Sequence, residues 1–246
     1  MVGTAQFSLA DLERDGFAVV PSVVPESHVA ALIDAVASFE ASHPAVREKG
    51  GSTYAVRRLC ELIPAIRALS GSPATRELIE PALGPSARVV RSILFDKSAA
   101  ANWKVPWHQD LTIAVKQRRE VNGFGPWSSK ADVPHVQPTT EVLQRMLTLR
   151  LHLDDCGPEN GPLRVVAGSH ALGTIDLDAV PEIRRTRREV TCTVPAGGAL
   201  LMRPLLLHAS SPAQRPGHRR VIHLEFAAGD LPGGLEWHES ALSVTR

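Results

Sequence analysis

The second half of the sequence is a series of short β-forming segments separated by turn-forming residues. Apolar and β-branched runs recur between residues 87 and 229, and glycine, proline and asparagine occur between them, as in PENGP at 158–162. Few helical patterns lie between these runs, which is typical of antiparallel sheets rather than of alternating strand–helix units. The sequence therefore predicts an antiparallel β-sandwich or barrel over residues 86–230.

One segment, residues 147–155 (LTLRLHLDD), alternates strictly between apolar and polar side chains. Successive side chains of a strand point to opposite faces, so leucines occupy one face and polar residues the other. Two interpretations are open. The polar face is either solvated, or it lines a ligand-holding cavity while the leucines pack beneath helices. The polar residues in question are Thr148, Arg150, His152 and Asp154.

The first third, residues 1–85, is predicted to be mostly helical. Pro25 opens a helix whose apolar residues recur at helical spacing up to Phe39, and residues 61–83 predict two short helices broken near Gly71. Residues 17–20 (FAVV) predict a strand. Because no glycine- or serine-rich linker separates this third from the β-rich part, residues 1–246 are expected to form a single domain.

Charge and composition narrow the class of function. With 27 basic and 26 acidic residues the formal net charge is +1, so we expect no binding to nucleic acid or to an anionic membrane. No apolar run approaches the roughly 18 residues of a membrane span, and no signal-peptide pattern opens the sequence. The three cysteines form no CxxC pair and are expected to be free thiols in a reducing compartment. We therefore expect a cytoplasmic monomer or homodimer that acts on a small molecule.

The tetrapeptide WHQD at 107–110 begins a predicted strand and carries the first candidate metal ligands. Residues i and i+2 of a strand share a face, so His108 and Asp110 can present an imidazole nitrogen and a carboxylate oxygen to one point. His208, at the end of the apolar stretch LLMRPLLLH, offers a second imidazole. Two histidines and one carboxylate form the facial triad of non-haem Fe(II) oxygenases. The alternative for His108 is an ordinary hydrogen-bonded histidine near a turn.

Two consecutive arginines follow His208 after a turn-rich linker and begin another predicted strand. Arginine binds a carboxylate through two parallel hydrogen bonds, which suits the far carboxylate of a 2-oxo acid that chelates iron. Arg219 shares its strand face with His223 and Glu225, whereas Arg220 shares the opposite, apolar face. The alternation therefore predicts that Arg219 points into a polar cavity. The alternative for the pair is a solvated strand end.

Together these motifs resemble the phytanoyl-CoA dioxygenase family of Fe(II)/2-oxoglutarate oxygenases. The resemblance rests on WHQD, on NGPLRVVAGSH, on LLLHASS, on the arginine-led strand and on the opening DGFAVVPSVVP, and it extends from about residue 9 to residue 227. It implies a double-stranded β-helix, or jelly-roll, that is mainly β and buttressed by N-terminal helices. The residues that the resemblance assigns are His108, Asp110 and His208 to iron, with Arg219, Ser210 and Gln109 assigned to the binding of the cofactors.

The resemblance also implies a reaction. Fe(II), 2-oxoglutarate and O₂ would together hydroxylate an unactivated C–H bond of a small-molecule substrate, with release of succinate and CO₂. Asp110 favours hydroxylation over halogenation, because related halogenases have glycine or alanine at this position and leave the site to chloride. Two alternatives are a metal-dependent dioxygenase of the same fold that uses no 2-oxoglutarate, and a non-catalytic jelly-roll binding module.

The segment 116–138 is polar, rich in glycine, proline and tryptophan, and lacks clear periodicity. Stretches of this length without regular structure are often functional lids. We expect this segment to lie at the mouth of the iron pocket, with Phe124 and Trp127 as apolar contacts to the substrate. The alternative is that both rings pack on the outside of the barrel.

Arg150 stands on the polar face of the alternating segment and is a further candidate substrate contact. Its guanidinium favours a substrate that carries a carboxylate or another anionic group. The alternative is that Arg150 pairs with Asp154 or Glu225.

Overall fold

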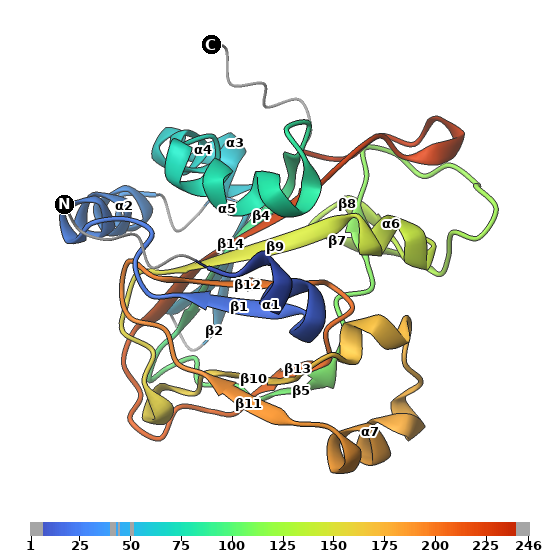
Figure 1. Cartoon of the computed structure of the whole chain (residues 1–246). Coiled ribbons are helices and arrows are strands. Elements are labelled where there is room, and N and C mark those ends of the chain that lie inside the picture. Colours follow the sequence, from blue (N-terminus) through green and yellow to red (C-terminus); the bar gives the residue numbers. More distant parts are fainter. Residues whose placement is uncertain (1–6, 40–42, 44, 50–51, 240–246) are drawn as a thin grey trace.

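The computed structural model describes residues 7–39, 43, 45–49 and 52–239. Two antiparallel sheets form its core (Figure 1). The larger has the strand order β1 (Phe17–Val20), β12 (Ala199–Met202), β9 (Met146–His152), β14 (Arg219–Ala227), β4 (Arg88–Lys97), β3 (Ser52–Arg57) and β2 (Val46–Lys49). The smaller has the order β11 (Glu189–Cys192), β10 (Leu163–Val166), β13 (His208–Ser210) and β5 (Val105–His108). The predicted jelly-roll, mainly β with flanking helices, is confirmed.

Helices cover the outer face of the larger sheet (Figure 1). The leucines of β9, among them Leu149 and Leu151, belong to one buried cluster with apolar residues of these helices, whereas Arg150 lies on the opposite, inner face and lines a cavity. The second interpretation of the alternating segment therefore describes β9. The covering helices are α2 (Glu26–Ala37), α3 (Leu59–Leu62), α4 (Pro64–Ser70) and α5 (Pro73–Leu83).

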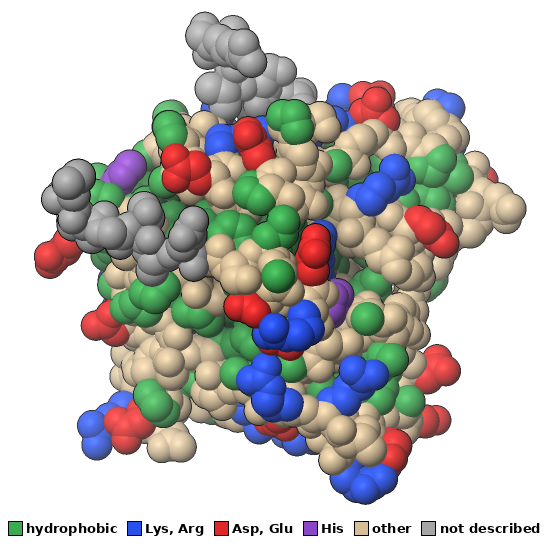
Figure 2. Space-filling view, in the orientation of Figure 1, with side chains coloured by type: hydrophobic (Ala, Val, Ile, Leu, Met, Phe, Trp, Pro, Cys, Tyr) green, Lys and Arg blue, Asp and Glu red, His purple; other side chains and the backbone are tan. Residues whose placement is uncertain are grey.

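Short helices occupy other connections. The α-helices among them are α1 (Leu9–Asp15), α6 (Thr140–Gln144) and α7 (Val180–Thr186). The single-turn 3₁₀-helices are η1 (Pro158–Asn160), η2 (Ser169–Leu172), η3 (Leu177–Ala179) and η4 (Pro232–Gly234). None of the described helices is long and apolar enough to cross a membrane. On the face shown in Figure 2, basic and acidic side chains are interspersed rather than gathered by sign.

The first third contributes more strand than its sequence predicts. The predicted strand β1 forms and pairs with β12, so that Val20 lies opposite Ala199. The hairpin of β2 and β3 was not expected, because its two strands are short and have no alternating apolar pattern; it extends the edge of the larger sheet through β4. Helices and sheet share one buried cluster. This shared core supports our proposal that the chain is one domain, although residues 1–6 and 240–246 lie outside the described part.

The segment 116–138, expected to lack regular structure, contains a β-hairpin. Its strands are β7 (Trp127–Lys130) and β8 (Val133–Val136), and β6 (Ile113–Ala114) pairs with β8 to complete a three-stranded sheet. The turn residues Ala131 and Asp132 have φ values of 53° and 60°. Two positive φ angles match the twist of a two-residue hairpin, a geometry that neither residue type signals as strongly as Asn-Gly does. This is why the hairpin escaped prediction.

Phe226 tests the packing between sheet and helices. Its side chain on β14 is 1% exposed and lies in the cluster that the helices cover. We expect Phe226→Ala to lower the free energy of unfolding by about 3–5 kcal/mol, because a large cavity replaces the ring. Urea denaturation followed by circular dichroism measures this. A loss below about 1 kcal/mol would mean that the helices do not pack here as described.

Glu239 fastens the C-terminal part of the chain to β4. Its Oε1 accepts a hydrogen bond from the Ser92 backbone N–H at 2.9 Å, and its Oε2 contacts the Ser92 hydroxyl. Burial raises the pKa of this carboxyl from 4.5 to about 7. The folded state therefore binds the proton more tightly than the unfolded state does between these two values.

This raised pKa predicts a pH dependence of stability. Between about pH 4.5 and pH 7 the folded chain holds more protons, so the stability of the wild type should fall as pH rises through this window. Glu239→Gln lacks this titrating proton, so its free energy of unfolding should not fall in the same way. Relative to the wild type, its free energy of unfolding should therefore increase by up to about 3 kcal/mol between the two ends of this window. Urea denaturation of both proteins at pH 5 and pH 8 measures the difference. A difference that does not change with pH would contradict the raised pKa.

Candidate metal centre and substrate pocket

Three potential metal ligands converge on the inner face of the smaller sheet. His108 ends β5 and lies opposite His208, the first residue of β13, while Asp110 is held just beyond β5 by a hydrogen bond from its backbone N–H to the Pro204 carbonyl. One ligand atom from each of these three residues lies within 4.8 Å of the others. The Asp110 carboxylate oxygens are 3.7 Å and 3.8 Å from the Nε2 atoms of His108 and His208. The predicted triad is therefore assembled by neighbouring strands.

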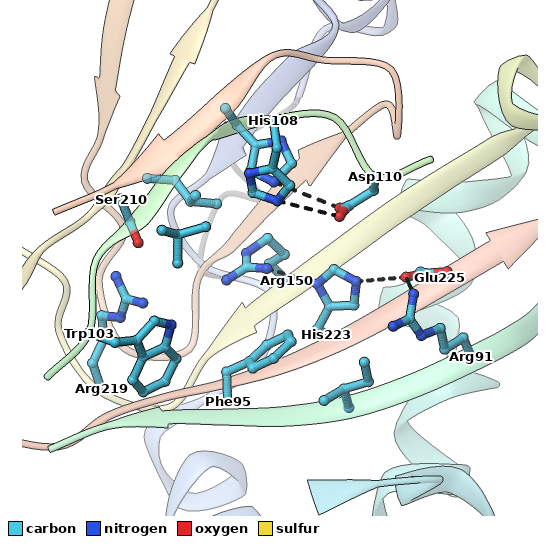
Figure 3. A pocket seen from close by; sticks show the side chains of 14 residues that line it. Arg91, Phe95, Trp103, His108, Asp110, Arg150, Ser210, Arg219, His223 and Glu225 are labelled. Carbon is cyan, nitrogen blue, oxygen red and sulfur yellow. Dashed lines mark hydrogen bonds and ion pairs between the residues drawn. The ribbon is translucent and has the colours of Figure 1, made fainter. Parts of the chain in front are cut away.

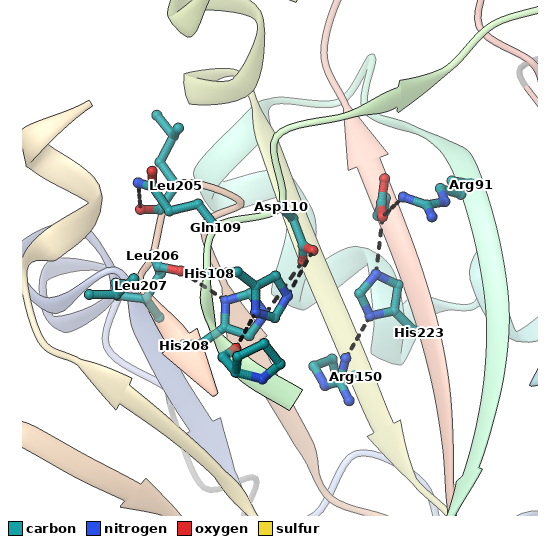
Figure 4. A network of polar contacts seen from close by, with 12 residues as sticks. Arg91, His108, Gln109, Asp110, Arg150, Leu205, Leu206, Leu207, His208 and His223 are labelled. Atoms are coloured by element: carbon teal, nitrogen blue, oxygen red, sulfur yellow. Dashed lines mark hydrogen bonds and ion pairs between the residues drawn. The ribbon is translucent and has the colours of Figure 1, made fainter. Parts of the chain in front are cut away.

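Hydrogen bonds orient both imidazoles toward the carboxylate. The Nδ1 atom of His108 lies 2.9 Å from the Pro106 carbonyl oxygen, and that of His208 lies 2.9 Å from the Leu206 carbonyl oxygen (Figure 4). A carbonyl oxygen only accepts, so each Nδ1 carries the proton and each Nε2 directs a lone pair toward Asp110. Neutral imidazoles with fixed tautomers and a facing carboxylate are what a divalent metal requires.

Electrostatics favour the same ionisation states. Burial lowers the pKa of His208 to about 4, so its ring is neutral at physiological pH. Desolvation raises the pKa of Asp110, but the electrostatic environment, to which the guanidinium of Arg91 contributes, outweighs it and holds the pKa below its ordinary value. The site therefore offers the Nε2 atoms of two histidines and one negative oxygen, a donor set that fits Fe(II).

These ligands open onto a cavity of about 250 Å³ between the two sheets. Figure 3 shows its two ends on either side of the metal ligands: Arg219 and Ser210 lie at one end, and His223 and Glu225 lie toward the other, with Arg150 between them. Apolar side chains complete the walls, namely Ile93, Phe95, Val105 and Leu163. The pocket thus has two polar ends joined by an apolar middle.

The first end is cationic. The side chain of Arg219 is 5% exposed and donates a hydrogen bond to the Gly161 carbonyl. Beside it Lys97, 1% exposed, donates to the Ser210 hydroxyl at 3.0 Å and to the Ser211 carbonyl at 2.8 Å. Burial and the charge of Arg219 lower the pKa of Lys97 to about 7. Among the described residues no carboxylate forms an ion pair with either cation, so this end is suited to an anion.

Arg220 points the other way. Its guanidinium pairs with the Asp154 carboxylate at 2.6 Å, and its backbone N–H also donates to that carboxylate. The next residues on the same face, including Ile222, belong to the cluster beneath the helices. The structure therefore places Arg219 and Arg220 on opposite faces of the strand, as the alternation of side chains predicts. Lys97 is not among the site residues predicted from the sequence, although the two-residue repeat of β4 places it on the same face as Arg91 and Phe95.

The other end carries a hydrogen-bonded series of four side chains (Figure 4). Arg150 donates to His223 Nδ1 at 2.8 Å, and His223 Nε2 lies 3.1 Å from a Glu225 carboxylate oxygen that also pairs with Arg91 at 2.9 Å. Because arginine only donates, the His223 proton is on Nε2 and is donated to Glu225. Within the described part of the chain, Arg150 therefore lines the pocket without an ion pair of its own, since Asp154 is bound to Arg220 and Glu225 is reached through His223.

Gln109 does not join the pocket. Its side-chain amide donates to the carbonyls of Gly173 at 2.8 Å and Leu205 at 2.6 Å, and its oxygen accepts from the Ile175 backbone N–H at 2.8 Å. Gln109 follows His108 on a chain whose side chains alternate, so it faces away from the metal ligands. In this structure its side chain fastens two connections behind the site, away from the expected cofactor position.

Gln109→Ala tests this assignment. Loss of three buried hydrogen bonds should lower the free energy of unfolding by about 1–3 kcal/mol, because the freed backbone groups stay buried. The apparent affinity for 2-oxoglutarate should change much less. Thermal unfolding and a 2-oxoglutarate titration of the same preparation measure both. A stable variant with strongly weakened 2-oxoglutarate binding would restore the original assignment.

The two aromatic residues expected to contact the substrate also lie elsewhere. Phe124, 8% exposed, belongs to a buried cluster that includes Val136 and Trp237, and Trp127 packs against that cluster with the Arg118 guanidinium 5.5 Å from its ring centre. Neither ring lines the pocket. The alternative interpretation, in which both pack on the outside of the barrel, therefore describes them.

Comparison with known proteins agrees with the fold and the site. The model of the family described as Phytanoyl-CoA dioxygenase (PhyH) matches residues 12–221. The chain belongs to the phytanoyl-CoA dioxygenase family. Membership confirms the resemblance drawn from the sequence and makes the chain an oxygenase by family.

Individual proteins extend the comparison. An L-proline trans-4-hydroxylase from Streptomyces griseoviridis is 25% identical over 242 residues, which cover 87% of this chain and 82% of that protein. EctD from S. alaskensis with bound Fe superimposes with a TM-score of 0.71 at 19% identity, over 96% of this chain and 83% of EctD. The epimerase SnoN, solved with Fe³⁺, α-ketoglutarate and nogalamycin RO, gives a TM-score of 0.67 at 20% identity, over 92% and 89% of the two chains.

Proposed function

We propose that this chain is an Fe(II)- and 2-oxoglutarate-dependent hydroxylase of a small molecule. The observation that carries the proposal is the placement of the His108–Asp110–His208 triad beside Arg219 and Ser210, which line the same pocket, with Lys97 behind them donating to the Ser210 hydroxyl. A metal triad alone fits several reactions. A triad next to a buried arginine that has no ion-pair partner among the described residues calls for an anionic co-substrate that also reaches the metal, as 2-oxoglutarate does.

The residues would divide the work as follows. His108, Asp110 and His208 would hold Fe(II) on one face, which leaves room for the co-substrate on the other side. Arg219, Lys97 and Ser210 would bind the distal carboxylate of 2-oxoglutarate, and the apolar middle of the pocket would exclude water. With both cofactors and O₂ bound, the iron supplies the oxidant that converts a C–H bond to C–OH, while 2-oxoglutarate becomes succinate and CO₂.

The printed names of relatives support hydroxylation as the outcome. The L-proline trans-4-hydroxylase is a hydroxylase by name, and one EctD structure contains 2-oxoglutarate and 5-hydroxyectoine. SnoN is named an epimerase and SnoK a carbocyclase, so the fold also carries other outcomes. Asp110 supports hydroxylation over halogenation here. Its carboxylate would occupy the coordination position that halogenases leave open for chloride.

Succinate release tests the proposal. The purified protein should convert 2-oxoglutarate to succinate only when Fe(II) and O₂ are present, and a chelator should stop the reaction. Candidate substrates that raise this rate should gain one oxygen atom, read by mass. Iron-dependent oxidation without 2-oxoglutarate would favour the same-fold dioxygenase, and metal binding without any turnover would favour the non-catalytic module.

A further inference from the structure

A second, smaller cavity adjoins the metal pocket at Arg91, which lies on the side of the pocket away from Arg219 (Figure 3). Its volume is about 20 Å³, and Arg91 and Ile93 line both spaces, so the two cavities meet at β4. The end of β3 contributes Arg57 to its wall, and the β7–β8 hairpin contributes Lys130. The hairpin is thus a wall of this end of the pocket.

Strand register places these cations in line with the metal pocket. Arg57 on β3 lies opposite Ile93 on β4, Ile93 lies opposite His223 on β14, and His223 lies opposite Arg150 on β9. Residues aligned across a sheet share a face, so this row runs along the inner face from the second cavity to the centre of the pocket. A ligand in the main pocket can therefore reach Arg57 without crossing the sheet.

Of the described residues that line the second cavity, four are cationic, namely Arg57, Arg58, Arg91 and Lys130, and one carries a carboxylate, Glu239, which is bound to Ser92. Among the described residues, Arg57 makes no ion pair and its Nε is buried without a hydrogen-bond partner, while the Lys130 ammonium donates to the Thr112 hydroxyl at 3.1 Å. The carboxylate of Glu225 is already bound to Arg91 and His223. Burial, together with the charge of Arg91, lowers the pKa of both Arg57 and Lys130. Keeping the two side chains charged at this position is therefore unfavourable for the free energy of the folded chain.

A buried acceptor in the same cavity also lacks a partner. His135 on β8 is 2% exposed, its Nδ1 lies 2.9 Å from the Val133 carbonyl, and its Nε2 has no hydrogen-bond partner. Native proteins leave few buried polar atoms unpaired, so such atoms together indicate a polar occupant. The Nε2 lone pair of His135 needs a donor, which a carboxylate does not supply, so only the donors of Arg57, Arg91 and Lys130 bear on the charge of the occupant. Guanidinium and ammonium donors in excess specify that the occupant is an anion.

We propose that Arg57, Arg91 and Lys130 bind a carboxylate of the substrate, at the opposite end of the pocket from the 2-oxoglutarate anchor. The substrate is then a small carboxylic acid, since the main cavity of about 250 Å³ must also hold the metal and the co-substrate. This inference rests on the proposed function and deepens it. Arg150 was expected to bind the charged group of the substrate, but its guanidinium is bound to His223. We assign this role instead to the wall formed by β3, β4 and the hairpin.

A thermal-shift experiment tests the site without requiring the true substrate. The protein is saturated with Mn(II) and 2-oxoglutarate, which occupy the metal and the Arg219 end, and is then titrated with acetate, propionate or butyrate at constant ionic strength. The matching amides serve as uncharged probes of the same shape. We expect the carboxylates to raise the Tm and the amides to leave it unchanged.

Single variants locate the effect. Arg57→Gln and Lys130→Gln should each weaken the carboxylate-dependent shift by about tenfold or more, the effect of losing one charged hydrogen bond. Each should also raise the Tm of the protein without added carboxylate, because repulsion between buried like charges is relieved. Arg185→Gln, which removes an exposed cation on α7 paired with Glu182, is the control and should change neither quantity.

The outcomes separate this inference from the proposed function. Equal shifts with acids and amides, or an unchanged carboxylate shift in both variants, would overturn the carboxylate site. Absence of a Tm shift with Mn(II) and 2-oxoglutarate would count against the proposed function instead. In that case the carboxylate series on the protein alone still tests Arg57 and Lys130, because only a site at these residues responds to their replacement.

Discussion

Asp110→Ala is expected to abolish 2-oxoglutarate turnover and to weaken metal binding by more than about 100-fold. Partners of metal ligands contribute about 10–100-fold to affinity, and a direct ligand contributes more. Asp110 provides the sole negative charge of the triad and faces both Nε2 atoms at 3.7 Å and 3.8 Å. Without it, two neutral imidazoles would remain to hold the ion. Competition titration with a metal-binding dye measures the affinity, and succinate release measures turnover.

Two controls make the Asp110 result specific. Asp154→Asn removes a carboxylate that pairs with Arg220 outside the pocket, and it should leave the metal affinity unchanged. The circular dichroism spectrum of Asp110→Ala should match that of the wild type, because the facing imidazole of His208 is neutral and is not left as an unpaired buried charge. Retention of wild-type metal affinity in a folded Asp110→Ala protein would remove Asp110 from the proposed site.

Arg219→Ala and Arg220→Ala are expected to differ sharply although the residues are adjacent. Arg219 lines the pocket beside Ser210, so its loss should raise the KM for 2-oxoglutarate by about 100-fold, the effect of losing a paired set of charged hydrogen bonds. Metal binding should survive. Arg220→Ala should leave that KM nearly unchanged but lower the Tm, because the half-buried Asp154 loses its partner.

Steady-state kinetics at varied 2-oxoglutarate, with thermal unfolding of the same preparations, distinguishes the two variants. Arg219→Lys provides a further check, since an ammonium keeps the charge without the two-pronged geometry and should recover part of the affinity. A larger KM effect in Arg220→Ala than in Arg219→Ala would mean that the strand faces are assigned in the wrong sense.

Most of the correct predictions about which way a side chain points came from the two-residue repeat of β-strands. The alternation of residues 147–155 separated the leucine face from Arg150, and the same rule separated Arg219 from Arg220 and brought His108 and Asp110 to one side. These features depend only on the two-residue repeat of a strand, which the sequence displays directly. The same rule places Gln109, which lies between His108 and Asp110, on the opposite side of the chain from both ligands.

What the sequence by itself determined is therefore the fold class, the convergence of His108, Asp110 and His208, and which of two adjacent arginines faces the pocket. Tertiary structure alone decided which distant residues meet. Lys97 reaches Ser210, and the hairpin brings Lys130 to the wall that holds Arg57. Such contacts depend on sheet order, register and turn geometry, to which many weak interactions contribute together. Phe124 and Trp127 show the same limit, because an aromatic ring in a polar segment packs equally well on a substrate or on a neighbouring core, and only the completed fold determines which one is within reach.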